Sequence, residues 1–225
     1  MDNGPWETSP PPREPLFRAP LVVLLLCAGL IGVHAALWFG HFSADQVLAP
    51  YALTGQAMTE RRWIPLFSHI FLHAGWAHVL MNAGFALAFG AAPARLFGPT
   101  IRGSVVFLAF FLACGAIAGL GYAAIQSDRN WAVIGASGAV AGLMGATSRM
   151  LNEGGRLGPP WGRGFAGMTL SWVALNALLG FTGIGASLSG GLQVAWQMHI
   201  IGYFAGAGLI GLFWGLAGRR DPITE

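Results

Sequence analysis

The sequence is poor in charge and contains no lysine. Only 9 % of its 225 residues are charged, against the roughly 25 % that is usual in soluble domains, whereas 55 % are hydrophobic. All 12 basic residues are arginine, and they are scattered singly or in adjacent pairs between apolar runs. This excludes a soluble domain and a nucleic-acid-binding face. The two cysteines, Cys27 and Cys114, fall inside apolar runs, so we expect buried thiols and no disulfide. The chain is therefore expected to be an integral membrane protein without a nucleic-acid partner.

Several apolar runs approach the length of about 20 residues that an α-helix needs to cross a bilayer. They predict an all-α membrane protein, a six-transmembrane helix bundle with a long interfacial first outer loop. The first run is too long for the core of a signal peptide and is interpreted as a retained helix. The spans are expected at about 20–39, 76–94, 103–125, 137–151, 165–184 and 192–216, and the fourth is short for a bilayer.

Three regions are expected along the chain. Residues 1–19 are polar and hold five prolines, which predicts a disordered cytoplasmic tail. Residues 20–217 form the six-helix membrane domain, and residues 218–225 form a second cytoplasmic tail. Within the domain, the segment 40–75 is neither polar throughout nor apolar for long enough to span. We therefore expect it to lie in the membrane interface.

The arginines are distributed unevenly between the loops. With the N-terminal tail inside and six spans, nine of the 12 lie on the cytoplasmic side, as the positive-inside rule requires. We expect both termini to be cytoplasmic and the membrane to be a bacterial inner (plasma) membrane. The start of the fourth span, with Ser137, then faces the outer side. The three arginines expected outside are Arg61, Arg62 and Arg129.

Polar side chains inside a bilayer are costly and therefore point to function. Ser137 stands among small residues in the segment 135–138 (Gly-Ala-Ser-Gly), where the short fourth helix is expected to begin. Ser137, Ala141 and Gly145 recur at i, i+4 and i+8, a small-residue face that a neighbouring helix can approach closely. The serine can equally be a helix cap in a glycine-rich protein. Ala139 stands where the G-x-S-x-G elbow has its last glycine.

A histidine accompanies small residues in the last expected span. His199, Gly202 and Gly206 lie at i, i+3 and i+7, on one face of a helix. That face can dock against the fourth helix and bring the imidazole to Ser137. The alternative is a histidine that hydrogen-bonds a neighbouring carbonyl.

Two further pairs of polar residues share the spacing of four. His78 and Asn82 lie on one face of the second span, where they can either stabilise an oxyanion or join helices by hydrogen bonds. His69 and His73 precede that span. Two histidines at this spacing can bind zinc, but a third ligand and an HExxH glutamate are missing. We therefore expect a structural hydrogen-bonding role for His69 and His73, and no metal.

The residue inventory excludes most kinds of intramembrane hydrolase. An aspartyl protease needs two aspartates within the spans, and all nine acidic residues lie in tails or loops. The same shortage excludes a Ser-His-Asp triad with a membrane-embedded acid. The lack of lysine excludes a Ser–Lys dyad, and the lack of HExxH excludes that class of zinc protease. A Ser–His dyad remains.

Together these residues resemble the rhomboid family of intramembrane serine proteases. The resemblance implies that Ser137 is the nucleophile and His199 the general base. It also implies an oxyanion site of His78, Asn82 and the backbone region of Gly135, with no cofactor. The matching pieces are His69…His73…His78-x-x-x-Asn82, then Gly135-x-Ser137-Gly138, then His199-x-x-Gly202-x-x-x-Gly206, in the family's order within residues 20–217.

The substrates that the resemblance implies are transmembrane segments of membrane proteins, cut near the outer face, and the other partners are membrane lipids. The segment 183–191 has four glycines in nine residues. It predicts a mobile cap over the site beside a lateral entrance, or merely a flexible connector. The glycines concerned are Gly183, Gly185, Gly190 and Gly191.

Two alternative functions remain open, and the sequence departs from the family pattern at one point. A catalytically silent rhomboid-like protein would bind membrane proteins without cutting them, and a small transporter would use the same polar residues as a pathway. The departure is Arg61-Arg62-Trp63 in the first outer loop, where rhomboids often carry Trp-Arg. It leaves the role of either arginine open.

Overall fold

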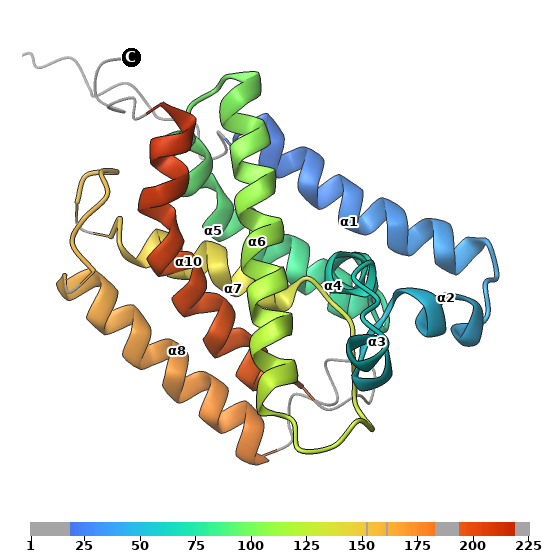
Figure 1. Ribbon diagram of the computed structural model, residues 1–225. Helices are drawn as coiled ribbons and strands as arrows, with labels where there is room; N and C mark the ends of the chain where they lie inside the picture. Colours follow the sequence, from blue (N-terminus) through green and yellow to red (C-terminus); the bar gives the residue numbers. More distant parts are fainter. Residues whose placement is uncertain (1–18, 152, 161, 183–193, 219–225) are drawn as a thin grey trace, which may run out of the picture.

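The structure, a computed structural model, describes residues 19–151, 153–160, 162–182 and 194–218. The described part is an α-helical bundle (Figure 1), as the sequence predicts. Five of the described helices are long and apolar enough to cross a membrane. These are α1 (Leu21–Phe39), α5 (Trp76–Phe97), α6 (Ile101–Ile125), α8 (Arg163–Thr182) and α10 (Trp196–Ala217), and a short helix, α7 (Ser137–Ser148), completes the bundle.

Three helix ends differ from the expected ones by three or more residues. Helix α5 continues through Pro93 to Phe97, three residues beyond the expected end, and stops at Gly98, whose φ of 90° suits glycine. Helix α7 ends at Ser148 instead of residue 151. Helix α10 begins at Trp196 instead of residue 192. The apolar runs show which segments are helices but do not show where a helix starts or ends, because apolar residues continue into the connections.

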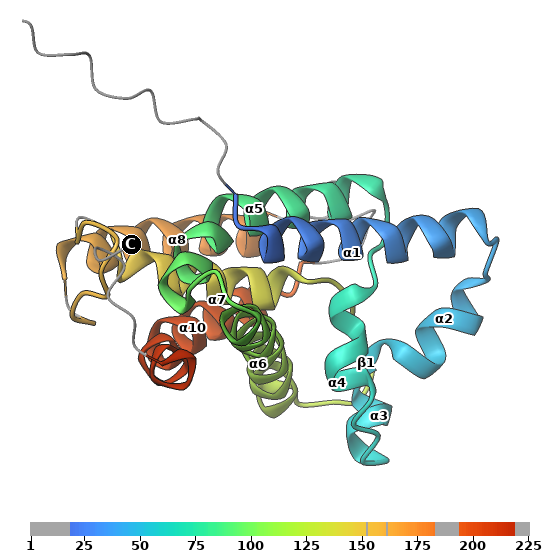
Figure 2. The same cartoon turned by 90° about the horizontal axis from the view of Figure 1, so that it is seen from above.

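Helix α7 lies inside the bundle and not at its surface. Figure 2 shows it between α5 and α8 on one side and α6 and α10 on the other. Ten of its 12 residues are buried. A helix of this length is about 18 Å long, well short of the roughly 30 Å hydrocarbon core. Because other helices surround α7, its N-terminus can lie at membrane depth without exposing unpaired backbone to lipid.

Glycine allows α7 and α10 to touch backbone to backbone. A Cβ on Gly202 would collide with the carbonyl oxygen of Gly138, and a Cβ on Gly206 would collide with that of Gly142. The predicted docking face of α10 is therefore confirmed.

The predicted docking face of α7 is confirmed in part. Gly145 packs against the backbone of Tyr203, and Ala141 belongs to one buried cluster with Tyr203. The neighbouring row of Gly138 and Gly142, which was not predicted, makes the backbone contacts with Gly202 and Gly206. Ser137 and Ala141 also line a cavity. The wholly glycine row permits the closer approach, and the neighbouring row carries the serine.

The segment before α5 folds into short elements around a small sheet. Strand β1 (Leu53–Thr54) pairs antiparallel with β2 (Ala132–Val133), which precedes α7. The loop between α1 and α5 is thereby attached to the segment that leads to Ser137. The other elements of this loop are α2 (Ala44–Tyr51), α3 (Gly55–Thr59), α4 (Pro65–Ser68) and the 3₁₀ helix η1 (His69–Phe71).

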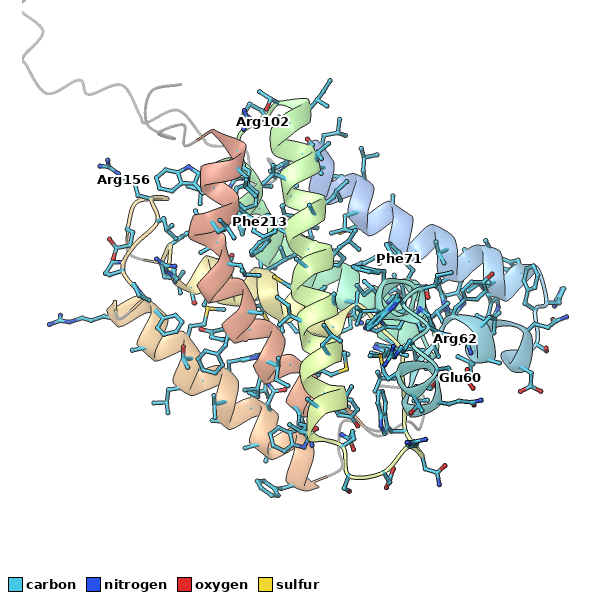
Figure 3. All side chains as sticks on the ribbon, viewed as in Figure 1. Glu60, Arg62, Phe71, Arg102, Arg156 and Phe213 are labelled. Atoms are coloured by element: carbon cyan, nitrogen blue, oxygen red, sulfur yellow. The ribbon has the colours of Figure 1, made fainter. Side chains whose placement is uncertain are left out.

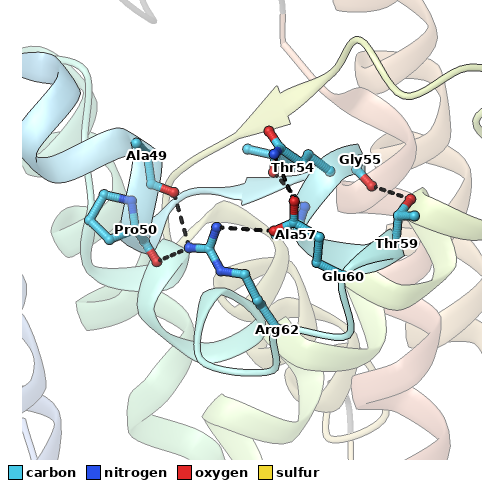
Figure 4. A network of polar contacts seen from close by, with 9 residues as sticks. Ala49, Pro50, Thr54, Gly55, Ala57, Thr59, Glu60 and Arg62 are labelled. Carbon is cyan, nitrogen blue, oxygen red and sulfur yellow. Dashed lines mark hydrogen bonds and ion pairs between the residues drawn. The ribbon is translucent and has the colours of Figure 1, made fainter.

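Arg62 joins the parts of this loop. Its guanidinium Nη2 donates hydrogen bonds to the carbonyl oxygens of Ala49 and Pro50, at 3.1 and 3.0 Å (Figure 4). Its Nη1 lies 3.7 Å from a carboxylate oxygen of Glu60. Arg62, rather than Arg61, therefore holds α2 against the turn that follows α3.

Three of the arginines can be located at the two ends of the bundle. Figure 3 places Arg102 and Arg156 toward the end where α6 begins and α10 ends, and Arg62 in the opposite half, beside α3. The orientation of the chain in the membrane remains a prediction. Cys27 and Cys114 are both free thiols; Cys114 is buried as expected, whereas Cys27 is only half-buried.

Candidate active site

The turn before α7 is held by the two histidines that precede α5. The N–H of Gly135 donates to the carbonyl oxygen of His69 at 2.8 Å. The N–H of Ala136 donates to Nε2 of His73 at 3.4 Å. Nδ1 of His69 in turn donates to the carbonyl oxygen of Pro65 at 2.8 Å. His69 and His73 thus have the structural role expected of them. Among the described residues, no group of three or more His, Cys, Asp or Glu is arranged to hold a metal ion.

Burial keeps both of these histidines neutral near pH 7. His69 is 1 % exposed and His73 is 8 % exposed. Desolvation lowers the pKa of His69 to about 4. Desolvation, helped by the nearby His78, lowers the pKa of His73 to about 3. A neutral His73 can accept the Ala136 hydrogen bond, which a doubly protonated ring cannot do.

Gly135 allows the turn to pass close to His78. Its φ is 120°, a backbone conformation that favours glycine. A Cβ at this position would lie 2.8 Å from Nε2 of His78. The missing side chain brings the His78 ring next to the start of α7.

Ser137 and His199 form a hydrogen-bonded pair. Ser137 is the first residue of α7, and His199 lies in the first turn of α10. Nε2 of His199 is 2.9 Å from Oγ of Ser137. The glycine contacts between α7 and α10 place these two N-terminal turns side by side. The structure thus brings together the two residues that the sequence paired.

Asn176, which the sequence analysis did not select, forms a hydrogen bond with the histidine of this pair. Oδ1 of Asn176, on α8, lies 2.8 Å from Nδ1 of His199. The indole Nε1 of Trp172 donates to the carbonyl oxygen of His199 at 3.4 Å. The available signal was an amide in the middle of an apolar run, the same signal that singled out Asn82.

The second span contributes two more polar groups. Nδ2 of Asn82 donates to the carbonyl oxygen of His78 at 2.9 Å, which leaves the second N–H of the amide free to bind another acceptor. Nδ1 of His78 accepts from the N–H of Ala74 at 3.5 Å. In neutral His78 the proton then sits on Nε2, the nitrogen next to Gly135.

The four polar side chains predicted to form the active site line one cavity of about 300 Å³. Ser137 and His199 contribute to it together with His78 and Asn82, and Gly135 also lies in its wall. The rest of the lining is largely apolar, with Met81 and Phe85 from α5, Met144 from α7, and Leu175 and Leu179 from α8. The predicted cap glycines Gly183, Gly185, Gly190 and Gly191 lie outside the described residues.

The model of one protein family, the Rhomboid domain, matches residues 60–216, more than half of the chain. The chain belongs to the rhomboid family. No curated protein matches the chain. The match covers every residue of the cavity, whereas α1 and α2 of this rhomboid precede it. Together with the five apolar helices, it identifies an integral membrane protein with the all-α rhomboid fold.

Proposed function

We propose that this rhomboid is an intramembrane serine endopeptidase that cleaves transmembrane segments of membrane proteins with a Ser137–His199 dyad. The observation that carries the proposal is the 2.9 Å contact between Ser137 Oγ and His199 Nε2. It lies in a cavity that also holds two further hydrogen-bond donors. A nucleophile, its base and candidate oxyanion donors are the minimum set for acyl transfer.

The reaction proceeds in two halves. Ser137 Oγ attacks the carbonyl carbon of the scissile peptide bond while His199 Nε2 takes the hydroxyl proton. The tetrahedral intermediate collapses, the C–N bond breaks, and His199 gives the proton to the departing amine. Water, deprotonated by His199, then attacks the acyl-enzyme and releases Ser137 with its proton restored.

The oxyanion is held by donors from α5 and α7. Nε2–H of His78 and the free N–H of Asn82 come from one side. The amide of Gly135 is already bound to His69, so we assign the backbone donors to Ser137 and Gly138. The first N–H groups of a helix lack intrahelical acceptors, and the helix dipole there favours negative charge.

The substrate reaches the site from the lipid, between α5 and α8. The cavity wall on this side is formed by Met81, Phe85 and Leu175, which are 38 %, 42 % and 43 % exposed. These side chains belong both to the cavity and to the outer surface of the bundle. A substrate helix must unwind locally to present a carbonyl, so we expect small or helix-breaking residues near the cut.

The arginine asymmetry supports the orientation that we propose. Both termini then lie in the cytoplasm, as tails of a membrane domain at 20–217, and the cavity opens toward the outer side of a bacterial inner membrane. Membrane lipids surround the exposed faces of α1 and α8. The cut accordingly falls near the outer end of the substrate span.

Cleavage by purified protein tests the proposal. The wild type and Ser137→Ala are incubated in detergent with a protein that carries one transmembrane segment, and the products are identified by mass spectrometry. We expect cleavage by the wild type and none by Ser137→Ala. If the wild type binds the substrate without cutting it, the protease proposal is wrong and the protein is a catalytically silent rhomboid-like binder.

A further inference from the structure

Asn176 has a different environment from the rest of α8. Of the residues of this helix, all of which the structure describes, only Asn176 is fully buried, with an exposed fraction of 0 %. A buried polar group on a membrane-spanning helix is costly unless its hydrogen bonds are made. Asn176 makes its hydrogen bonds to Trp172 and to His199.

The two hydrogen bonds define which way the amide points. Nδ2 of Asn176 lies 2.9 Å from the carbonyl oxygen of Trp172, one helical turn earlier. A carbonyl oxygen can only accept, so the nitrogen of the amide must be the atom on that side. The atom that faces Nδ1 of His199 at 2.8 Å is therefore the oxygen, Oδ1.

An oxygen at this position selects one tautomer of the histidine. Oδ1 can only accept, so Nδ1 of His199 must carry the proton. Nε2 of the neutral ring is then unprotonated, with its lone pair toward Ser137 Oγ at 2.9 Å. This is the form that a general base requires, and the opposite tautomer could not take the serine proton.

We propose that Asn176 is a positioning residue, which holds His199 in the tautomer and orientation that activate Ser137. The inference rests on the proposed function for its effect on cleavage. With Asn176 included, the site is a hydrogen-bonded series Ser137–His199–Asn176, and its third member is a neutral amide on a different helix. No carboxylate takes this place, because the described lining of the cavity holds no acidic residue.

The location of Asn176 also links the base to the substrate entrance. Leu175, its neighbour on α8, lines the cavity and is 43 % exposed. Helix α8 is held to α10 by polar contacts, those of Asn176 and Trp172 with His199 and that of Thr169 Oγ1 with Tyr203 Oη at 3.0 Å. An outward movement of α8 would therefore break the bond between Asn176 and His199.

Three variants separate positioning from packing. Asn176→Leu keeps the approximate size but removes the acceptor, and Asn176→Asp keeps an acceptor at the same place. Thr169→Val is the matched control, because it removes an α8–α10 hydrogen bond that does not involve His199. We expect Asn176→Leu to lower kcat by roughly 10–100-fold, by analogy with the loss of the group that orients a metal-bound histidine through its second nitrogen, with KM little changed. Asn176→Asp should restore much of that rate.

The pH profile provides a readout that a packing role would not move. A carboxylate beside Nδ1 stabilises the protonated ring, so the acid limb of the rate profile of Asn176→Asp should move to higher pH than in the wild type. The other titratable side chain lining the described cavity is His78, which is the same in every variant. Thr169→Val should keep the wild-type profile. If all three variants had the same kcat and the same profile as the wild type, Asn176 would not position the base.

Nitrogen NMR of histidine-labelled protein tests the tautomer without any activity. The His199 signals are assigned by comparison with His199→Gln. We expect a protonated Nδ1 and an unprotonated Nε2 in the neutral wild type, and a mixture in Asn176→Leu. A protonated Nε2 in the wild type would overturn the inference. A wild type with the expected tautomer that cuts no substrate would instead refute the proposed function alone.

Discussion

The carbonyl oxygen of Gly142 on α7 lies directly against Gly206 on α10, with no room for a side chain between them. This contact and the similar one between Gly138 and Gly202 hold the N-terminal turns of the two helices together. Those turns carry the serine and the histidine of the site. The geometry of the proposed dyad therefore depends on glycines to which the proposal gives no chemical role.

Gly206→Ala should separate α7 from α10. Overpacking of this kind costs roughly 1–3 kcal/mol, and a displacement of about 1 Å at a catalytic group costs about 10²-fold in rate. We expect a lower thermal midpoint and a fall in turnover of about that size. The control is Gly208→Ala on the same helix, where a new Cβ meets nothing within 4 Å. Equal turnover of the two variants would mean that the contact does not set the dyad geometry.

His78→Ala and Asn82→Ala distinguish oxyanion donors from helix contacts. Loss of one oxyanion donor lowers kcat by about 10²–10³-fold, and we expect this for each variant with near-normal substrate binding. Cleavage should still exceed that of Ser137→Ala, and the double variant should lose far less than the product of the two effects. If a folded Asn82→Ala protein has the wild-type kcat, the polar residues of α5 only join helices and do not stabilise the oxyanion.

Stability should fall in acid because of the buried histidines beside the turn. The pKa of His73, lowered by burial to about 3, is below its unfolded value of about 6.5. The unfolded state therefore binds more protons between these values, so stability is complete above about pH 6.5 and declines as the pH falls. We expect the thermal midpoint to be level above about pH 7 and to decrease toward about pH 4.5.

His73→Gln should make that decline shallower, because the amide accepts the Ala136 hydrogen bond but does not titrate. His41→Gln, at an exposed position outside the site, is the control and should keep the wild-type slope. A wild-type midpoint that does not change with pH would show that these rings are not buried as neutral groups.

Cysteine labelling tests the orientation. In a background with Cys27 and Cys114 replaced by alanine, Asp128→Cys should react with a membrane-impermeant maleimide from outside in spheroplasts. Thr224→Cys should react only after the membrane is opened. Asp128 is exposed, in the connection between α6 and α7, so its thiol would be accessible. Labelling of Thr224→Cys in intact spheroplasts would show that the orientation is the opposite of the one proposed.

The helices and the contact between Ser137 and His199 could be predicted from the sequence for physical reasons. A span needs a long apolar run, which the composition shows directly. In a chain without lysine or intramembrane acid, very few side chains can activate a serine, so Ser137 and His199 followed from the residue inventory and from the family resemblance.

The finer contacts could not be predicted in this way. A helix rich in small residues has several faces that a neighbour can approach, so the row of Ser137 and Ala141 could not be separated from that of Gly138 and Gly142. Asn176 was missed for a related reason. Its partner lies 23 residues away on another helix, and nothing in the local sequence shows which of its faces is buried.

The most direct test of the dyad is covalent labelling with a fluorophosphonate, followed by peptide mapping. The reagent forms a stable bond only with an activated serine, so we expect one modified residue, Ser137, in the wild-type protein. Ser137→Ala should not be labelled, and His199→Ala should be folded but unlabelled, since its serine has no base. Labelling of a different serine, or undiminished labelling of His199→Ala, would contradict the assignment of Ser137 and His199.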